Sequence, residues 1–449
     1  MIINRDIINE NIIYDGHSKQ DICNRINRWK RLIKYNYGLK KGDTVCLLLL
    51  KVDINHIAAA IAIAELGMKL FLTNKPISME TIHATKMAIH GPMDLTIQSK
   101  DIYGEPWPPE HHELVRLYSK KICQEEEIYG IDSDEDITDN VEVSPDDPYL
   151  FGSTSGTKST SKPILWSHKD CFFVSETNVK HTIRMTSQSV SYNTLNMHHT
   201  AAMLAYLLPA LMVAETHYSM WVTKDNIPEY VDNIIKFGVD NTIVHIAILP
   251  SILQEIEKRK EEFTKRITFL CAGFSLTKNE YDVCKRLPVN FNSGYGATEI
   301  GGPTILFVDD KTEYIPKNIG KLVEGYKFHF EGDDIFVSSR LWNGEKRKIE
   351  DNITFDGENY YYEGRKEVLP DLHPFDFRPV LNDNFEDWLL LYRDGQPDLI
   401  IWNHEPVNFE NSYIPLNRFC RKIFFLDKTQ FMDSTKLSME QVRAYVENN

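Results

Sequence analysis

Ser153-Thr154-Ser155-Gly156-Thr157-Lys158-Ser159-Thr160-Ser161-Lys162 is the stretch that decides how the chain is interpreted. Its seven hydroxyls, one glycine and two lysines favour a phosphate-binding loop. Hydroxyl and backbone N–H groups can surround phosphate oxygens, Gly156 allows close approach of the backbone, and a lysine offsets the negative charge. The same composition is typical of a surface linker, and no Gly-Lys-Ser/Thr ends the stretch as in a Walker A loop. This stretch alone leaves both interpretations open.

The composition of the 449-residue chain is that of a soluble globular protein with two or three domains, because 42% of its residues are hydrophobic and 26% are charged. A net charge of −15 argues against a general nucleic-acid binder, which needs a basic face. Seven cysteines without CxxC pairs indicate neither a disulfide framework nor a zinc site. The sequence shows no signal-peptide layout and no bilayer-length apolar stretch, so we expect a cytoplasmic protein without a membrane partner.

Hydrophobic periodicity predicts a strand-helix-strand unit in the first 72 residues. Residues 18–37 have apolar side chains at helical spacing. After them come an apolar strand at 44–50, an Ala/Ile-rich helix at 54–66 that Gly67 ends, and a short strand at 69–72. Such units build parallel sheets.

The rest of the chain gives weaker signals. The segment 132–147 is dominated by acidic residues and proline follows it, so we expect a solvated linker there. Sequence patterns also predict helices at 169–180 and 201–213, and strands at 190–195 and 267–270.

The phosphate-loop stretch resembles that of the adenylate-forming enzymes, which include acyl- and aryl-CoA synthetases, luciferases and peptide-synthetase adenylation domains. Their loop reads Thr/Ser-Ser-Gly-Thr-Thr-Gly-x-Pro-Lys, with a histidine a few residues on. Here Thr154-Ser155-Gly156-Thr157, Lys162 and Ser167-His168 match that pattern. The resemblance implies that Thr154, Ser155, Thr157 and Lys162 hold phosphates. The loop departs from the family where threonine, glycine and proline are replaced by Lys158, Ser159 and Ser161.

A second motif, 291–299, ends in Gly294-Tyr295-Gly296-Ala297-Thr298-Glu299 and matches the family's Tyr-Gly-x-Thr-Glu. The resemblance implies that Tyr295, next to Gly294, stacks on adenine, that Thr298 contacts the α-phosphate and that Glu299 binds Mg²⁺. An aromatic face suits a purine and a carboxylate suits a hard cation. A Gly-Tyr-Gly turn before a helix is the alternative interpretation for the motif taken alone.

The resemblance also implies a pocket for a carboxylic acid. The family has a histidine-containing turn that gates this pocket, and His199 matches it; a packed histidine is the alternative, and a zinc ligand is poorly supported. Small residues let the backbone contact the acyl group, and the candidates beside it are Ala272, Gly273 and Asn292. No acidic residue between 192 and 213 can hold an ammonium group, which favours an aryl or acyl acid over an α-amino acid.

The C-terminal part resembles the family more loosely. Asp351 is similar in position to the aspartate that holds both ribose hydroxyls, although the Thr-Gly before it is absent, and Asp356 is the second candidate. The stretch 364–367 matches the Gly-Arg-x-Asp hinge, with Arg365 expected at the nucleotide and Glu367 at the hinge position. Lys436 is the candidate catalytic lysine, which enters to neutralise charge between the carboxylate and the α-phosphate; a surface lysine is the alternative.

These matches imply an α/β fold with a large N-terminal domain of mixed sheets flanked by helices, 1–364, and a small mobile α+β lid, 365–449. The implied reaction is ATP- and Mg²⁺-dependent activation of a small carboxylic acid as acyl-AMP, with transfer of the acyl group to CoA, a carrier-protein thiol or an amine. Two alternatives stay open. One is a stand-alone adenylation domain that loads an amino or aryl acid onto a separate carrier protein; the other is a non-catalytic relative that binds nucleotide.

Overall fold

The computed structural model describes the chain except residues 49–52, 73–92, 100, 103–104, 107–108, 138–140, 154–162, 196–201, 246–247, 273–277, 298–299, 301, 310–312, 341, 343–344, 350, 366–387, 394–395, 403–421, 427–431, 434–435, 438 and 449. The chain forms two compact units, of which the first extends to Gly364 and the second begins at Arg365. Among the described residues, no helix is long and apolar enough to cross a bilayer.

A six-stranded sheet forms the first part of unit 1. Its order is β10 (Pro163–Ser167), β9 (Pro148–Ser153), β4 (Lys69–Leu72), β3 (Thr44–Leu48), β5 (Leu95–Gln98) and β8 (Ile122–Gln124). The central strand β3 lies parallel to both β4 and β5, and α2 (Ile54–Glu65) connects β3 to β4. The predicted strand-helix-strand unit is therefore confirmed. Gly67 follows α2 at φ +63°, a conformation that glycine adopts without strain.

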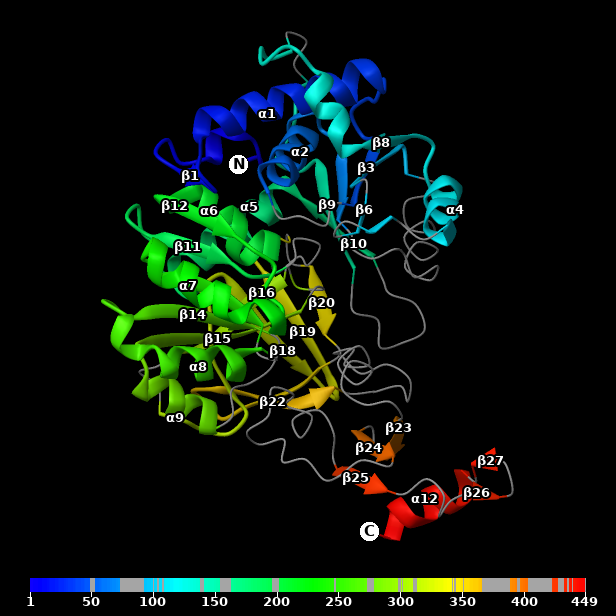
Figure 1. The fold of residues 1–449 in the computed structure, drawn as a ribbon, viewed down its shortest axis with the longest axis vertical. Helices are drawn as coiled ribbons and strands as arrows, with labels where there is room; N and C mark the ends of the chain where they lie inside the picture. Colours follow the sequence, from blue (N-terminus) through cyan, green and yellow to red (C-terminus); the bar gives the residue numbers. More distant parts are fainter. Residues whose placement is uncertain are drawn as a thin grey trace. The chain divides into compact units, whose positions relative to one another are not determined.

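Helix α1 (Lys19–Arg31) packs on α2 (Figure 1). It begins at a capping box, because the Asp21 backbone N–H donates to Ser18 Oγ and the Ser18 N–H donates to the Asp21 carboxylate. Ile22, Ile26 and Trp29 are buried along one face, as the predicted helical spacing requires. The helix continues as a π-helix over Leu32–Asn36.

An eleven-stranded sheet forms the second part of unit 1. Its order is β2 (His17–Ser18), β1 (Ile13–Tyr14), β12 (Thr216–Ser219), β11 (Val190–Asn193), β13 (Asn241–His245), β14 (Ile267–Ala272), β15 (Val289–Ala297), β16 (Gly302–Asp309), β17 (Asn318–Leu322), β22 (Tyr360–Arg365) and β21 (Asp351–Phe355). Strands β1, β12, β11, β13, β14 and β15 run parallel, whereas β16, β17 and β22 continue antiparallel.

Helices cover this sheet along its parallel half. Helix α7 (Ile227–Phe237) packs against α8 (Leu249–Lys258), and α8 against α9 (Lys278–Arg286); their buried side chains form one core cluster with those of β14 and β15. The other helical segments of this half are α5 (His168–Thr177), the π-helical segments Asn178–Ile183 and Ala202–Leu207, and α6 (Leu208–Val213).

Smaller elements complete the two units. Unit 1 contains the antiparallel sheet β18 (Tyr326–Glu331), β19 (Asp334–Ser339) and β20 (Lys346–Ile349), the pair β6 (Asp101–Ile102) and β7 (Glu105–Pro106), and helix α4 (Pro109–Tyr118). Unit 2 contains β23 (Trp388–Arg393), β24 (Gln396–Trp402), β25 (Lys422–Leu426), β26 (Met432–Asp433), β27 (Lys436–Leu437) and α12 (Met439–Asn448). The predicted α/β class with mixed sheets is confirmed.

The described part of the acidic segment is irregular and its acidic residues are exposed, as predicted for a linker, but it also makes contacts that were not predicted. Residues 134–136 lie against α1: the Asp134 carboxylate pairs with Arg28, and the backbone carbonyl of Glu135 accepts a hydrogen bond from Arg31 Nε at 2.9 Å. Asp136 Oδ1 accepts from Lys30 Nζ at 2.6 Å. The segment lies here because its carboxylates attract the basic residues at the end of α1.

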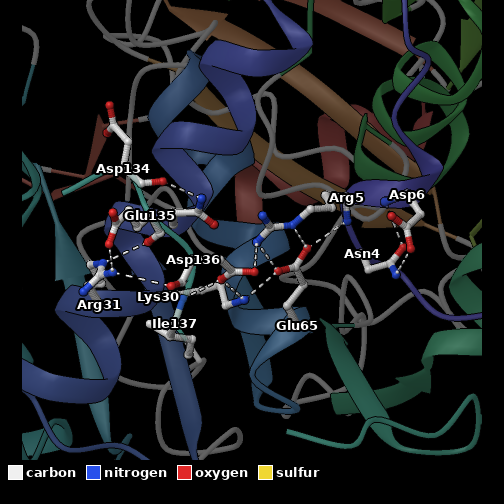
Figure 2. A network of polar contacts seen from close by, with 11 residues as sticks. Asn4, Arg5, Asp6, Lys30, Arg31, Glu65, Asp134, Glu135, Asp136 and Ile137 are labelled. Atoms are coloured by element: carbon white, nitrogen blue, oxygen red, sulfur yellow. Dashed lines mark hydrogen bonds and ion pairs between the residues drawn. The ribbon is translucent and has the colours of Figure 1, made fainter. Parts of the chain in front are cut away.

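The centre of this contact is a buried ionic network (Figure 2). Glu65 on α2 accepts from Arg5 Nε and Nη2 at 2.8 and 2.6 Å, and from Lys30 Nζ at 3.0 Å. The Lys30 side chain is 4% exposed and that of Glu65 is 10% exposed. The network therefore joins the N-terminal segment, α1, α2 and the acidic segment.

Both carboxylates of the network have a lowered pKa. Burial opposes ionisation of Glu65, but hydrogen bonds from Arg5 and the charges of Arg5 and Lys30 outweigh it, so its pKa lies below 4.5. Burial likewise opposes ionisation of Asp136, and the hydrogen bond from Lys30 and the charge of Arg5 bring its pKa below 3.8. Both groups are thus held ionised at neutral pH.

Replacing Glu65 by Gln should lower the free energy of unfolding of unit 1 by about 3 kcal/mol, because it leaves the buried Lys30 ammonium without one of its two carboxylates. Urea unfolding followed by circular dichroism at pH 7 measures the loss. The control is Glu363→Gln, which removes an exposed pair with Lys317 and should cost less than about 1 kcal/mol. Equal effects of the two substitutions would show that the network contributes no more than a surface ion pair.

The same variant should change the response to acid. A carboxylate with a lowered pKa stabilises the fold above its ordinary pKa, and this contribution is lost as the pH falls through the lower folded value. The stability difference between wild type and Glu65→Gln should therefore be constant above about pH 5 and shrink as the pH drops below 4.5. Urea unfolding at a series of pH values measures it, and a difference that grows in acid would contradict the assignment.

Candidate active site

The carboxyl ends of three neighbouring parallel strands lie at one edge of the large sheet. Asn193 ends β11, His245 ends β13 and Ala272 ends β14, and the register pairs His245 with Ala272. Ligands of open α/β sheets bind at this edge, because loops and helix starts surround it. Ala272, a predicted acid-pocket residue, therefore ends its strand where a substrate is expected.

Strand β15 carries three predicted residues, Asn292, Gly294 and Tyr295. Asn292 is buried and pairs with Leu270 in β14. Among the described residues, the pairing of β15 with β14 ends at Ser293, and beyond it β15 pairs with β16, with a register shift between Tyr295 and Ala297. The Gly-Tyr-Gly segment thus belongs to a strand that extends past its parallel neighbour, and the alternative of a turn before a helix was wrong.

Tyr295 and Asp351 meet in the interior of unit 1. The Tyr295 hydroxyl donates to Asp351 Oδ2 at 2.5 Å, although the two residues lie 56 positions apart. Tyr295 is 9% exposed and Asp351 is 6% exposed. A hydrogen bond to one oxygen fixes the plane of a carboxylate, which can accept several bonds in total. The pair can therefore present an aromatic face to a base and an oriented carboxylate to ribose hydroxyls.

The carboxylate of Asp356, the second ribose candidate, already accepts hydrogen bonds from residues of its own turn. Its Oδ1 accepts from the backbone N–H groups of Glu358 and Asn359, each at 2.8 Å, and its Oδ2 accepts from the Tyr361 hydroxyl at 2.6 Å. The hydrogen bonds from Asn359, Tyr361 and Glu358 lower its pKa to about 2. This exposed carboxylate shapes the turn between β21 and β22, so Asp351 is the better candidate.

The phosphate-loop stretch connects β9 to β10, and Ser153 pairs with Pro163 at the mouth of this hairpin. His168, the histidine of the motif, begins α5 and is fully buried. Its ring stacks on Tyr149 at 4.9 Å, and its Nδ1 accepts from the Ile3 backbone N–H at 3.1 Å. Burial lowers the pKa of His168 to about 4, so the ring is neutral and anchors the N-terminal segment.

The remaining predicted residues are only partly described. Arg365 ends β22, and Lys436 begins β27 in unit 2, where it pairs with Asp433. No group of three or more His, Cys, Asp or Glu residues arranged to hold a metal is found in the described part of the chain. The predicted residues outside the described residues are Thr154, Ser155, Gly156, Thr157, Lys162, His199, Gly273, Thr298, Glu299 and Glu367.

Two residues near the site were not predicted. Tyr362 on β22 has its ring 6.1 Å from that of Tyr295, and His245 lies at the carboxyl edge beside Ala272. The position of His245 at the end of an apolar strand was a usable signal. No sequence signal could have placed Tyr362, because its approach to Tyr295 depends on how the strands of the large sheet are ordered.

Comparisons with known proteins agree with this geometry. The family model described as AMP-binding enzyme matches residues 17–334. A search of curated proteins finds no match. Among solved structures, o-succinylbenzoate CoA synthetase from Bacillus subtilis with bound AMP is 17% identical, with a TM-score of 0.70 over 99% of this chain and 96% of that one.

Two further structures have the same fold. The anthranilate CoA ligase AuaEII in complex with anthranoyl-AMP is 13% identical, with a TM-score of 0.71 over 99% of this chain and 97% of that one. A benzoate CoA ligase from Burkholderia xenovorans is 14% identical, with a TM-score of 0.67 over 97% and 96%. The Bacillus subtilis enzyme has also been solved with ATP and magnesium. At these identities the likeness establishes the fold.

Replacing Tyr295 by Phe should weaken the binding of adenine nucleotide about tenfold, because the ring stays while the hydrogen bond that orients Asp351 is lost. Isothermal titration with ATP measures the change. Tyr361→Phe is the matched control, since it removes a hydroxyl that donates to the exposed Asp356, and it should leave affinity unchanged. If both variants bind ATP as wild type does, the Tyr295 hydroxyl does not position Asp351 for the nucleotide.

Proposed function

The chain belongs to the family of AMP-binding enzymes, and from this premise we propose that it activates a small aryl acid with ATP and passes the acyl group to the thiol of CoA. The family match confirms the predicted enzyme class, an acid ligase that forms acyl-AMP and releases pyrophosphate. The observation that carries the proposal is the buried pair of Tyr295 and Asp351, which joins two motifs of one nucleotide site.

The nucleoside is held, in this proposal, by the end of β15 and the start of β21. The Tyr295 ring stacks on adenine and the Asp351 carboxylate accepts hydrogen bonds from the ribose hydroxyls. Arg365 ends β22, the strand that follows β21 in the chain. Burial of both side chains supports the assignment, because a buried carboxylate strongly favours a ligand that donates hydrogen bonds to it.

The first chemical step forms a bond between a carboxylate oxygen of the acid and the α-phosphorus of ATP, while the bond to the bridging oxygen breaks and pyrophosphate leaves. We assign the phosphates to Thr154, Ser155, Thr157 and Lys162, with Gly156 allowing close approach, and the α-phosphate to Thr298. Bound Mg²⁺ would neutralise phosphate charge, and the Glu299 carboxylate is the type of ligand that this cation prefers. The enzyme acts by positioning and charge neutralisation.

The acid is proposed to be aromatic. No acidic residue between 192 and 213 can hold the ammonium group of an amino acid. The named substrates of the similar structures, o-succinylbenzoate, anthranilate and benzoate, are aryl acids, which supports this class. His199, Ala272, Gly273 and Asn292 are the proposed contacts, and buried Asn292 can hydrogen-bond a ring substituent.

The acceptor is proposed to be CoA, because the similar structures are CoA ligases and CoA synthetases. A separate carrier protein is the second candidate. Its support is the stretch after the hinge residue Glu367, where Pro370, Pro374 and Pro379 interrupt the sequence that borders the pantetheine channel in the family.

Incubation of the full chain with ATP, Mg²⁺, CoA and a panel of aryl, fatty and amino acids tests the proposal. Mass spectrometry should detect AMP and the CoA thioester of one aryl acid. Formation of AMP and acyl-AMP without a thioester would move the acceptor to a carrier protein, and activation of fatty or amino acids alone would overturn the aryl assignment.

Lys436→Ala should slow formation of acyl-AMP by about 10² to 10³-fold while changing ATP affinity little, because this lysine is proposed to neutralise charge that develops between carboxylate and α-phosphate. Single-turnover release of pyrophosphate measures the rate. Lys422→Ala removes another lysine of unit 2, exposed on β25, and should react like wild type. An unchanged rate in Lys436→Ala would show that this lysine is not catalytic.

A further inference from the structure

A groove lies on the sheet of β18, β19 and β20. It has a volume of about 380 Å³ and is open to solvent. Lys327, Ser338 and Lys346 are direct cross-strand partners, so their side chains share one face of the sheet, and His329 follows two residues after Lys327 on the same face. Arg340, at the end of β19, completes the lining together with Gly325, Tyr326 and Ser339.

Some cations of this groove form ion pairs with carboxylates and others do not. Lys346 pairs with Glu331 at 2.5 Å, and on the neighbouring row Lys348 pairs with Asp334 at 2.8 Å. For Lys327 and Arg340, both exposed, no ion pair with a carboxylate is found among the described residues. The chain has a net charge of −15, whereas this groove is lined by two cations that have no carboxylate partner among the described residues.

Hydroxyl and imidazole groups stand beside these cations. His329 Nε2 and Ser338 Oγ lie 2.8 Å apart in a hydrogen bond. A serine hydroxyl can donate to a ligand oxygen while it accepts from a histidine. The groove therefore offers a guanidinium, an ammonium and a hydroxyl, which are the groups that hold a tetrahedral oxyanion.

Aromatic packing under the groove holds this arrangement in place. The Arg340 guanidinium lies 4.8 Å from the centre of the Phe173 ring, on α5, and its backbone N–H donates to the Gly325 carbonyl at 3.0 Å. Gly325 has φ +94°, and a Cβ there would approach Phe173 Cζ to 2.9 Å, so a side chain at this position would push Phe173 away. Tyr326 also packs on Phe173, at 5.5 Å between ring centres.

We propose that this groove binds a phosphate group, either free phosphate or the phosphate monoester of a nucleotide. The Arg340 guanidinium and the Lys327 ammonium donate charge-assisted hydrogen bonds to its oxygens, and Ser338 donates a third. The volume is at the lower end of the range of small-molecule pockets. The lining residues are distinct in sequence from the phosphate-loop stretch 154–162.

Isothermal titration of the full chain with inorganic phosphate, at low ionic strength and without ATP, tests the proposal. Wild type should bind phosphate saturably, and Lys327→Gln/Arg340→Gln should bind at least about tenfold more weakly. Lys317→Gln/Lys321→Gln is the matched control, because each of these lysines is already paired, with Glu363 and Glu358 respectively, and it should bind as wild type does.

Further variants separate the groove from other causes. Lys327→Gln alone, at an exposed position, should keep the thermal midpoint of wild type and still lose affinity. Lys162→Gln is the discriminating variant at the phosphate loop: if phosphate affinity falls in this variant and is kept in the groove variants, phosphate binds at the loop and the proposal is wrong. No saturable binding by wild type would also overturn it.

A parallel titration with adenosine 3′,5′-bisphosphate identifies the source of the phosphate. Binding that is tighter than that of inorganic phosphate, and that weakens in Lys327→Gln/Arg340→Gln, supports a nucleotide-borne phosphate. Equal binding of both probes that weakens in the same variant supports free phosphate. Binding of the bisphosphate that is unaffected in the groove variant while phosphate does not bind contradicts the site.

Discussion

The parallel alignment of β13, β14 and β15 is the constraint on which the site depends. It brings the ends of strands from distant parts of the chain to one edge, and it extends β15 beyond β14 so that Tyr295 lies past the parallel half of the sheet. In the sheet order, β16, β17 and β22 separate β15 from β21. The hydrogen bond from Tyr295 to Asp351 therefore requires the antiparallel half of the sheet to curl back, and it gives both buried polar groups a partner.

The ionic network supports a different part of the same unit. Glu65 and Lys30 join α2 to α1, and Asp136 brings the acidic segment that precedes β9 onto the same helix. The two carboxylates contact the same two cations, Arg5 and Lys30. Attraction to these cations offsets the free energy that it costs to remove the carboxylates from water. His168 acts in parallel, because its buried neutral ring holds the N-terminal segment through the Ile3 backbone. The hairpin of β9 and β10, which carries the phosphate-loop stretch, is therefore preceded in the chain by the acidic segment bound to α1 and followed by His168.

Sequence patterns predicted the features that are local. Apolar periodicity and Gly67 predicted β3, α2 and β4, since the strand-helix-strand unit is encoded within thirty residues. The motif around Tyr295 and the position of Asp351 predicted two residues that the structure brings together. Patterns failed where a partner lies far away in sequence. The acidic residues 134–136 are exposed, as predicted, but no pattern indicates that they pair with α1. Nor does a pattern indicate that Lys327, Ser338 and Lys346 form one row.

The central claim is that this chain forms an acyl-adenylate, and acid-dependent exchange of labelled pyrophosphate into ATP tests it most directly. The exchange requires only the first half-reaction, so it is independent of the acceptor. The account predicts Mg²⁺-dependent exchange with an aryl acid and none without acid. ATP binding without exchange for any acid of the panel would contradict it and indicate a relative that binds nucleotide without catalysis.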